Sequence, residues 1–217
     1  MGLFQDAKFV AGVAELSQLP RESAGEVAFA GRSNAGKSSA INALLNRKRL
    51  AFVSRTPGRT QQVNFFDLGN QRYLVDLPGY GYAKVAKTGR ARWEGLLPTY
   101  LQTRESLRGL VVIMDVRHPL TDLDLTLLGL FAPTAKPVHV LLTKADKISR
   151  GDAITTLREV EENLARRFGF VTCQLFSSLS KQGVDSARAT LTGWLRLALQ
   201  PARGIEKPPA KGEQNRG

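Results

Sequence analysis

Cysteine is almost absent from this sequence, since Cys173 is the single one among 217 residues. A lone cysteine excludes an internal disulfide and fits a reducing compartment, and we expect it to act as a small apolar residue on a strand. Long apolar runs are also missing, because the longest, such as residues 109–114, are far too short to span a bilayer. The N-terminus, MGLFQDAKF, lacks a basic stretch followed by an apolar one, so no secretory signal is expected. These absences predict a soluble cytoplasmic protein.

Acidic residues are too few to balance the basic ones. The chain has 31 Lys and Arg against 19 Asp and Glu, which gives a formal net charge of +12. This excess favours a polyanionic partner, either nucleic acid or an anionic membrane surface. No basic amphipathic helix with an aromatic face stands out, so stable membrane association is not expected and nucleic acid is favoured. A generally basic soluble protein is the alternative.

Hydrophobic residues make up 42% of the chain, which is enough for a core. Apolar strand patterns alternate with helical patterns, as in a parallel sheet with crossover helices. Strands are expected at residues 26–31, 63–77 (a hairpin turning at Gly69-Asn70), 109–117, 137–144 and 171–178, and helices at 37–46, after Ser149 and at 184–199. The prediction is an α/β fold with a six-stranded, mostly parallel sheet flanked by helices on both faces.

The pattern divides the chain into three parts. Residues 1–21 are expected to form an N-terminal extension before the first clear strand, and residues 22–200 the domain. Residues 201–217 are rich in Pro, Gly and charge, which predicts a disordered tail. Two basic stretches without periodicity, 47–62 and 79–90, interrupt the domain. They are interpreted either as solvated loops or as mobile elements that respond to a ligand and touch a polyanion.

The stretch GRSNAGKS, residues 31–38, matches G-x-x-x-x-G-K-[ST] between a predicted strand and a predicted helix. Its glycines allow successive N–H groups to curl around phosphates, and the helix N-terminus adds partial positive charge. Lys37 is expected to reach the β- and γ-phosphates, and Ser38 to coordinate Mg²⁺. The sequence therefore predicts a phosphate-binding loop.

The stretch DLPGY places a carboxylate and a glycine just after a strand. Asp76 is expected to hold Mg²⁺, usually through water, and Gly79 to offer its N–H to the γ-phosphate. Tyr80 follows, where many GTP-hydrolysing switches have a glutamine that orients the attacking water. A tyrosine cannot act in the same way, so the sequence leaves open what completes catalysis.

The stretch TKAD, residues 143–146, ends another predicted strand. The carboxylate of Asp146 can accept two hydrogen bonds from guanine, a pattern that adenine does not offer, and Lys144 can lay its apolar stem on the purine ring. An ordinary strand-end turn is the alternative. Residues 177–183, SSLSKQG, follow the last strand and could place N–H groups near guanine O6.

A threonine in the loop TPGRTQQ is expected to complete the Mg²⁺ shell and to respond to the γ-phosphate. Thr60 is preferred, and Thr56 is its competitor. Both precede a predicted strand, which is where such a switch threonine is found.

The series GRSNAGKSS, TPGRTQ, DLPGYGYA, MDVRHPL, LLTKAD and FSSLSKQGV, in order over residues 26–199, resembles the bacterial EngB/YihA/YsxC family of ribosome-biogenesis GTP-binding proteins. This family belongs to the TrmE-Era-EngA-EngB-Septin-like P-loop GTPases. The resemblance implies a Ras-like fold, GTP or GDP as ligand, Mg²⁺ as cofactor, and a role in assembly of the large (50S) ribosomal subunit and in cell division and septation. The chain departs from the commoner guanine motif because Thr143 replaces the usual Asn.

Carried onto this sequence, the resemblance gives a full set of site residues. The catalytic candidates are Lys37, Thr60, Asn34 and Gly79. The GTP-binding candidates are Gly31, Arg32, Ser33, Asn34, Ala35, Gly36, Lys37, Ser38, Ser39, Gly58, Arg59, Thr60, Gln61, Gln62, Asp76, Leu77, Pro78, Gly79, Thr143, Lys144, Ala145, Asp146, Phe176, Ser177 and Ser178. The metal candidates are Ser38, Thr60 and Asp76 for Mg²⁺, and Asn34 for K⁺.

Asn34 offers a replacement for the missing glutamine. In potassium-dependent relatives, an asparagine at this loop position coordinates a monovalent cation beside the phosphates, where other systems use an arginine finger worth about 10³–10⁵ in rate. The hypothesis is a slow, monomeric GTPase accelerated by K⁺ or by docking on the ribosomal particle and its rRNA, with Tyr80 as a packing residue. The alternative is an RNA-binding assembly scaffold in which GTP is mainly a structural ligand.

Overall fold

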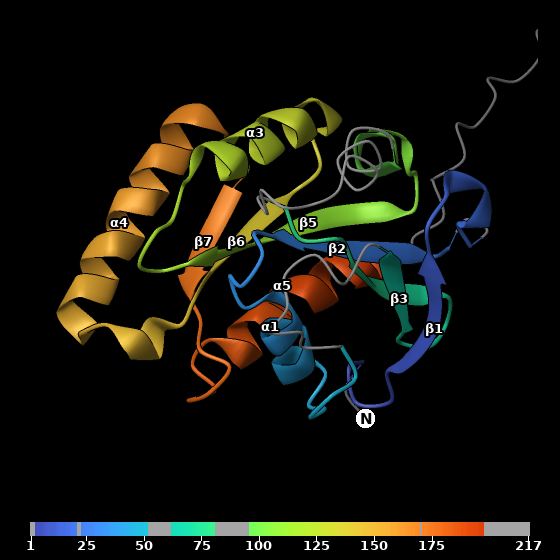
Figure 1. Cartoon of the computed structure of the whole chain (residues 1–217), viewed down its shortest axis with the longest axis horizontal. Helices are drawn as coiled ribbons and strands as arrows, with labels where there is room; N and C mark the ends of the chain where they lie inside the picture. The colour runs from blue at the N-terminus through green and yellow to red at the C-terminus, as the bar shows by residue number, and fades with distance from the viewer. Residues whose placement is uncertain (1–2, 21–22, 52–61, 81–95, 170, 198–217) are drawn as a thin grey trace, which may run out of the picture.

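The computed structural model describes residues 3–20, 23–51, 62–80, 96–169 and 171–197, which form one sheet between two sets of helices (Figure 1). The strands are β1 (Lys8–Val13), β2 (Gly25–Gly31), β3 (Val63–Asp67), β4 (Arg72–Asp76), β5 (Leu107–Asp115), β6 (Val138–Thr143) and β7 (Val171–Leu175). The helices are α1 (Lys37–Leu44), a helix whose described part covers residues 96–103, α3 (Asp122–Phe131), α4 (Arg150–Arg167) and α5 (Val184–Leu197). Short 3-10 turns lie at Leu16–Gln18, Ala132–Thr134 and Ala145–Lys147.

The strand order is β1-β3-β4-β2-β5-β6-β7. Strands β4, β2, β5, β6 and β7 run parallel to one another, whereas β3 runs antiparallel to both β4 and β1. The central parallel strands are buried on both faces, which explains their continuous apolar runs. The predicted α/β fold with a mostly parallel sheet is therefore confirmed.

The described residues form a seven-stranded sheet, one strand more than the six that were predicted. The additional strand is β1, which lies within the segment that the sequence pattern assigned to an N-terminal extension. It pairs with β3 at the edge of the sheet, its register shifts between Phe9 and Ala11, and only Val13 at its end is buried. An edge strand with an interrupted alternation of buried and exposed residues gives a weak sequence signal.

The expected hairpin is confirmed by the antiparallel pairing of β3 with β4. Its turn contains three successive residues with positive φ, namely Gly69 (85°), Asn70 (53°) and Gln71 (57°). The side chain of Asp67 accepts a hydrogen bond from Gly69 N at 2.8 Å, which closes the turn. Glycine and asparagine reach this backbone region at low cost, so the turn dipeptide was an informative signal.

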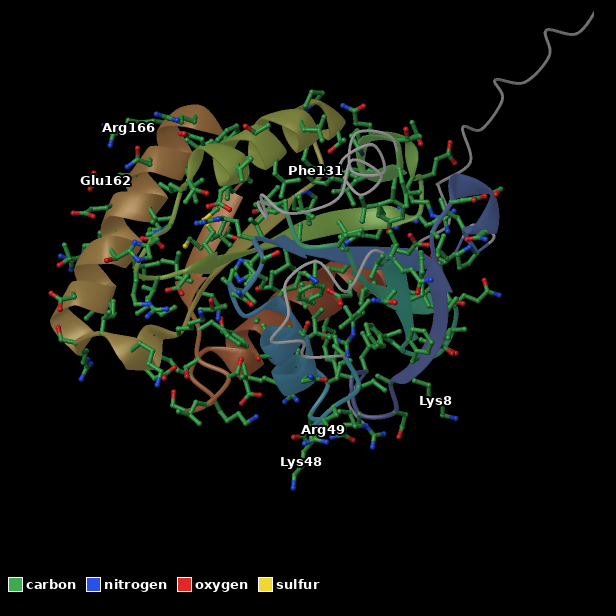
Figure 2. All side chains as sticks on the ribbon, in the orientation of Figure 1. Lys8, Lys48, Arg49, Phe131, Glu162 and Arg166 are labelled. Carbon is green, nitrogen blue, oxygen red and sulfur yellow. The ribbon has the colours of Figure 1, made fainter. Side chains whose placement is uncertain are left out.

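Each face of the sheet carries its own apolar cluster. Helices α1 and α5 cover one face, and their residues Ile41, Leu44 and Leu191 are fully buried against it. Helices α3 and α4 and the helix at 96–103 cover the other face, on which Phe131 is buried between α3 and the strands (Figures 1 and 2). The prediction of helices on both faces is confirmed.

The carboxyl ends of β2, β4, β5, β6 and β7 meet at one end of the sheet because these strands are parallel. In open α/β sheets, ligands bind at this end.

Cys173 on β7 is partly buried among core residues, and burial raises the pKa of its thiol, as expected for a small apolar residue. No described helix is both long and apolar enough to cross a membrane.

Candidate nucleotide-binding site

The loop between β2 and α1 has the backbone geometry that its glycines predict. A Cβ on Gly31 would lie 2.9 Å from backbone and side-chain atoms of Ile113 on β5, so only glycine fits without displacement. Gly36 has a φ of 102°, which favours glycine, and it immediately precedes Lys37, the first residue of α1. The loop therefore opens directly onto a helix N-terminus, where N–H groups and the helix dipole favour an anion.

A buried ion pair joins this loop to the end of β4. Lys37 Nζ contacts Asp76 Oδ1, and both residues are buried. Asp76 is the last residue of β4 and lies opposite Phe29 in the register with β2, close to where β2 enters the loop. Lys37 is the side chain expected to meet phosphate, so the lysine and the candidate metal-binding carboxylate stand together beside the loop.

The residues here fit a magnesium ion that takes part of its shell from a phosphate. Asp76 and the half-buried Ser38 supply oxygen donors, the type that Mg²⁺ prefers. Within the described ranges there is no group of three His, Cys, Asp or Glu that could hold a metal. A single carboxylate and a hydroxyl suit Mg²⁺ because this ion usually keeps waters and phosphate oxygens in its shell.

The segment after Asp76 is hydrogen-bonded to the phosphate loop. Tyr80 N donates to Gly31 O at 3.3 Å, and Ser33 N donates to Tyr80 O at 3.0 Å, which forms a parallel bridge between Arg32 and Tyr80. A Cβ on Gly79 would lie 3.2 Å from Ser33 Oγ. Gly79 therefore packs directly on the loop, where its N–H can be offered to a bound phosphate.

The side chain of Tyr80 points into the core. It is 3% exposed, and its hydroxyl donates a 2.6 Å hydrogen bond to Asp124 Oδ1 at the start of α3. The other oxygen of Asp124 accepts bonds from Thr121 N and Thr121 Oγ1, which completes the N-terminal cap of α3. Burial raises the pKa of the Tyr80 hydroxyl, and the Asp124 carboxylate raises it further, so it stays protonated and donates. The expectation of a packing role for Tyr80 is confirmed.

The last residue of β6, Thr143, and the residue after it, Lys144, connect the guanine end of the site to the phosphate loop. The Thr143 hydroxyl lies within hydrogen-bond reach of Ala35 O and Met114 O, and Lys144 Nζ donates to Asn34 O at 2.7 Å. Lys144 and Asn34 have φ values of 60° and 66°. Thr143, where the commoner motif has asparagine, therefore still connects β6 to the phosphate loop.

A second carboxylate lies beside this lysine. Asp115, the last residue of β5, has Oδ2 2.9 Å from Lys144 Nζ. The Arg117 guanidinium donates two hydrogen bonds to the same carboxylate, from Nε to Oδ1 at 2.9 Å and from Nη2 to Oδ2 at 2.6 Å. Both residues belong to the stretch MDVRHPL, and the sequence alone predicted no role for either of them.

Asp146, the carboxylate expected to recognise guanine, lies next to the loop that follows β7. Asp146 Oδ1 accepts a 2.6 Å hydrogen bond from Ser177 Oγ, and this bond holds the pKa of the Asp146 carboxyl below its usual value. Ser177 is fully buried, and its Oγ also accepts bonds from Leu179 N and Ser180 N. An ionised, oriented carboxylate is what recognition of two guanine N–H groups requires.

A buried histidine supports the loop that follows β7. His139 Nε2 lies 3.1 Å from Gln174 Oε1, and Gln174 Nε2 donates to Gly183 O at 2.7 Å, just before α5. Since the amide nitrogen of Gln174 faces a carbonyl, its oxygen faces the histidine, so Nε2 of His139 carries the proton. Nδ1 of His139 then accepts from Thr172 Oγ1 at 2.7 Å. Burial lowers the pKa of His139, which favours the neutral ring.

The predicted nucleotide positions at residues 31–39, 76–79, 143–146 and 176–178 begin at or directly after the carboxyl ends of β2, β4, β6 and β7, at one end of the sheet. Gln62 lies apart from them, at the sheet edge beside Gly12 of β1. The side chain of Asn34 is exposed. Gly58, Arg59, Thr60 and Gln61, with Thr56, fall outside the described residues, so their predicted roles remain predictions. Asp115 and Asp124 are the additions that the structure makes.

A phosphate loop, a DxxG segment bonded to it and a guanine-side motif on a mostly parallel sheet define a P-loop GTPase. A family described as "50S ribosome-binding GTPase" matches residues 26–144. The curated "Probable GTP-binding protein EngB" of Dechloromonas aromatica is 54% identical over 98% of this chain and 97% of its own, and that of Azoarcus sp. is 57% identical over 97% and 99%. The chain belongs to the EngB family of GTP-binding proteins, and it is a GTPase.

Solved structures agree with this fold. The crystal structure of a probable GTP-binding protein engB superposes with a TM-score of 0.61 at 19% identity, covering 80% of this chain and all of that one. Era in complex with MgGDPNP and nucleotides of 16S ribosomal RNA superposes with a TM-score of 0.61 at 24% identity, covering 80% of this chain and 57% of that chain. At these identities, the likeness shows the fold alone.

Proposed function

We propose that this GTPase acts in assembly of the large ribosomal subunit, binds its rRNA, and hydrolyses GTP slowly until K⁺ or the ribosomal particle accelerates it. We further propose that it works as a cytoplasmic monomer and that its effect on cell division and septation follows from this role. The observation that carries the slow intrinsic rate is the buried hydroxyl of Tyr80, bonded to Asp124. A residue held there is not available to orient an attacking water, so the missing transition-state stabilisation has to come from elsewhere.

The proposed nucleotide contacts follow the geometry described above. Lys37 and the loop N–H groups bind the phosphates, Gly79 responds to the γ-phosphate, and Asp146 reads guanine. Ser38 and Asp76, with Thr60 from outside the described residues, would hold Mg²⁺, which would neutralise phosphate charge. Asn34, whose side chain is exposed at the loop, is the proposed K⁺ ligand.

Support for an RNA partner comes from exposed cations that form no ion pair among the described residues. Lys8, Lys48 and Arg49 are exposed and form no ion pair with any described residue. Lys48 and Arg49 follow the end of α1 and project from the molecule (Figure 2), and Arg47 beside them donates to Gln5 O at 3.0 Å, which links this loop to the N-terminal segment. Exposed cations of this kind suit phosphate groups, and binding through them weakens as salt rises.

Co-sedimentation with large-subunit particles in GTP, GDP and no nucleotide tests the partner. We expect the GTP form to co-sediment, and Lys48→Ala/Arg49→Ala to reduce this binding with GTP affinity unchanged. Arg166→Ala is the matched control, since Arg166 on α4 is also exposed but faces Glu162 at 3.8 Å (Figure 2). Equal sedimentation in all nucleotide states would contradict the proposal.

Turnover measured in K⁺ and in Na⁺, for the wild type and Asn34→Ala, tests the cation. Identical rates throughout would remove K⁺ from the proposal. The same assay with and without particles separates the switch from an RNA-binding scaffold in which GTP is mainly structural. No stimulation by particles, together with normal function of a variant unable to hydrolyse GTP, would favour the scaffold.

A further inference from the structure

Asp115 occupies a position between the guanine end of the site and an exposed loop. It ends β5 and is paired in register with Thr143 of β6, so it stands beside Lys144, the first residue after β6. Its carboxylate meets two cations, the ammonium of Lys144 at 2.9 Å and the guanidinium of Arg117 at 2.6 Å. The pair with Lys144 is half-buried, with side-chain exposures of 32% for the lysine and 15% for the aspartate, so solvent screens it only in part.

The same lysine reaches across the phosphate loop. Its Nζ donates to Asn34 O at 2.7 Å, and its Cε lies 3.9 Å from the position that a Cβ on Gly36 would take. The aliphatic part of the Lys144 side chain therefore lies over the phosphate loop, and its ammonium is held by Asp115 at the end of β5 and by Asn34 O in the loop. Without Asp115, the backbone carbonyl of Asn34 would be the one remaining partner of this ammonium among the described residues.

We propose that Asp115 is a positioning residue for guanine-nucleotide binding, because its carboxylate holds the Lys144 ammonium and so fixes the lysine stem over the phosphate loop. This inference rests on the assignment of Lys144 to the nucleotide site made above. A lysine side chain otherwise populates many rotamers, and fixing one of them before the ligand arrives lowers the entropic cost of binding.

The charge state of Asp115 suits this role. Burial by itself raises the pKa of the carboxyl, but hydrogen bonds from Arg117 and Lys144 outweigh burial and hold the pKa well below its usual value. The carboxylate is thus ionised at neutral pH. Arg117 and Lys144 each pair with this carboxylate through their own side chains, so the two cations can be removed separately.

A purely local role for Asp115 gives different expectations. Asp115 also closes its own turn, since Oδ1 accepts from Arg117 N at 3.1 Å and its carbonyl accepts from His118 N at 2.9 Å. If this were its whole contribution, losing the carboxylate would affect the turn and leave nucleotide affinity unchanged. Arg117→Ala and Asp115→Asn would then behave alike.

The test measures dissociation constants of GDP and a non-hydrolysable GTP analogue on the full chain. We expect Asp115→Asn to weaken both by about tenfold, with their ratio unchanged, and to add no further loss in a Lys144→Met background. Arg117→Ala should stay within about twofold of the wild type, because it leaves the pair of Asp115 with Lys144 in place. Asp185→Asn is the charge-matched control, since it removes a surface partner of Arg188 on α5.

Three results would overturn the positioning role. They are an unchanged affinity in Asp115→Asn, losses that add fully in the Asp115→Asn/Lys144→Met double variant, and equal losses in Asp115→Asn and Arg117→Ala. Melting temperatures without nucleotide are recorded in parallel, and the Arg117→Ala comparison keeps the test decisive if Asp115→Asn is less stable. A wild type that binds neither nucleotide would instead contradict the proposed site as a whole.

Discussion

Two of the ion pairs in the described part of the chain are buried, and they lie at opposite ends of the sheet. At the carboxyl end, Lys37 contacts Asp76. At the amino end, near the start of β2, Glu26 meets Arg104 at 2.6 Å. Both carboxylates are almost fully removed from solvent, yet their surroundings differ in the number of hydrogen-bond donors that they offer.

Glu26 is surrounded by donors. Its two oxygens accept from Nε and Nη2 of Arg104, from the hydroxyl of Tyr100 at 2.8 Å and from that of Ser23 at 3.0 Å. Arg104 also donates to Pro20 O. Asp76 has Lys37 as its side-chain partner among the described residues. A saturated cluster holds the fold in one arrangement, whereas a pair with spare donor and acceptor capacity can take on a ligand.

Replacing Lys37 with methionine should have the largest effect, and it removes the ion pair at the carboxyl end of the sheet, where the nucleotide is expected to bind. Loss of charged hydrogen bonds to phosphate, each worth about 1.5–3 kcal/mol, should weaken GDP and GTP binding by roughly 10²–10⁴-fold. Isothermal titration measures this directly. Affinity within tenfold of the wild type would show that the lysine is not a phosphate ligand.

Replacing Arg104 with methionine should affect the structural ion pair at the amino end of the sheet. The free energy of unfolding should fall by about 3–5 kcal/mol, because Glu26 is left buried without its cation. Nucleotide affinity of the folded protein should not change. Urea denaturation measures the loss, and Arg108→Met at the same end of the sheet is the control, since Arg108 makes no described ion pair. If Arg104→Met had the same unfolding midpoint as the wild type, the Glu26–Arg104 pair would not be the structural counterpart of the Lys37–Asp76 pair.

Replacing Tyr80 with phenylalanine tests the buried hydrogen bond from Tyr80 to Asp124. This bond lies at the nucleotide-binding end of the sheet but is expected to serve stability and not binding. The ring still fits the core, but Asp124 Oδ1 loses its donor, so stability should fall by about 1–3 kcal/mol. GTP affinity and hydrolysis should persist, because the hydroxyl does not face the phosphates. If Tyr80→Phe abolished hydrolysis while leaving GTP affinity intact, the packing role would be wrong.

The smallest expected effect is the pH dependence of stability contributed by His139. Its pKa is lowered in the folded protein from the usual 6.5, so below about pH 6.5 the unfolded chain binds more protons. Its contribution is complete above pH 6.5 and is lost as the pH falls towards the folded pKa, with a slope of at most about 1.4 kcal/mol per pH unit. His139→Gln should remove this component when urea midpoints at pH 7.5 and 5.5 are compared. Identical pH profiles would contradict it.

The sequence predicted the parts of the molecule that local signals specify. The central strands are buried on both faces and read as apolar runs, the hairpin carries Gly69-Asn70, and α4 begins directly after Ser149, whose side chain caps it by accepting from Asp152 N. The phosphate loop was identified because its glycines and lysine have to follow one another in the chain.

Features that depend on contacts between distant segments were not predicted. Tyr80 and Asp124 are 44 residues apart, and nothing in either segment signals their hydrogen bond. Asp115 meets Lys144 only because parallel pairing of β5 with β6 brings two strand ends together. The aspartate and lysine types were visible in the sequence, but their partnership is a product of sheet order.

The strand β1 has a practical consequence for anyone who shortens the chain to its motif-bearing part. Trimming residues 1–21 would uncover β3, whose VNFFD sequence includes the buried Phe65 and Phe66, and would leave its N–H and C=O groups open to another chain. The natural edge is better protected, because β1 carries Lys8 and an irregular register. Such a truncated protein should aggregate at concentrations where the full chain stays dispersed, so the N-terminal segment belongs in any sample prepared for biochemistry.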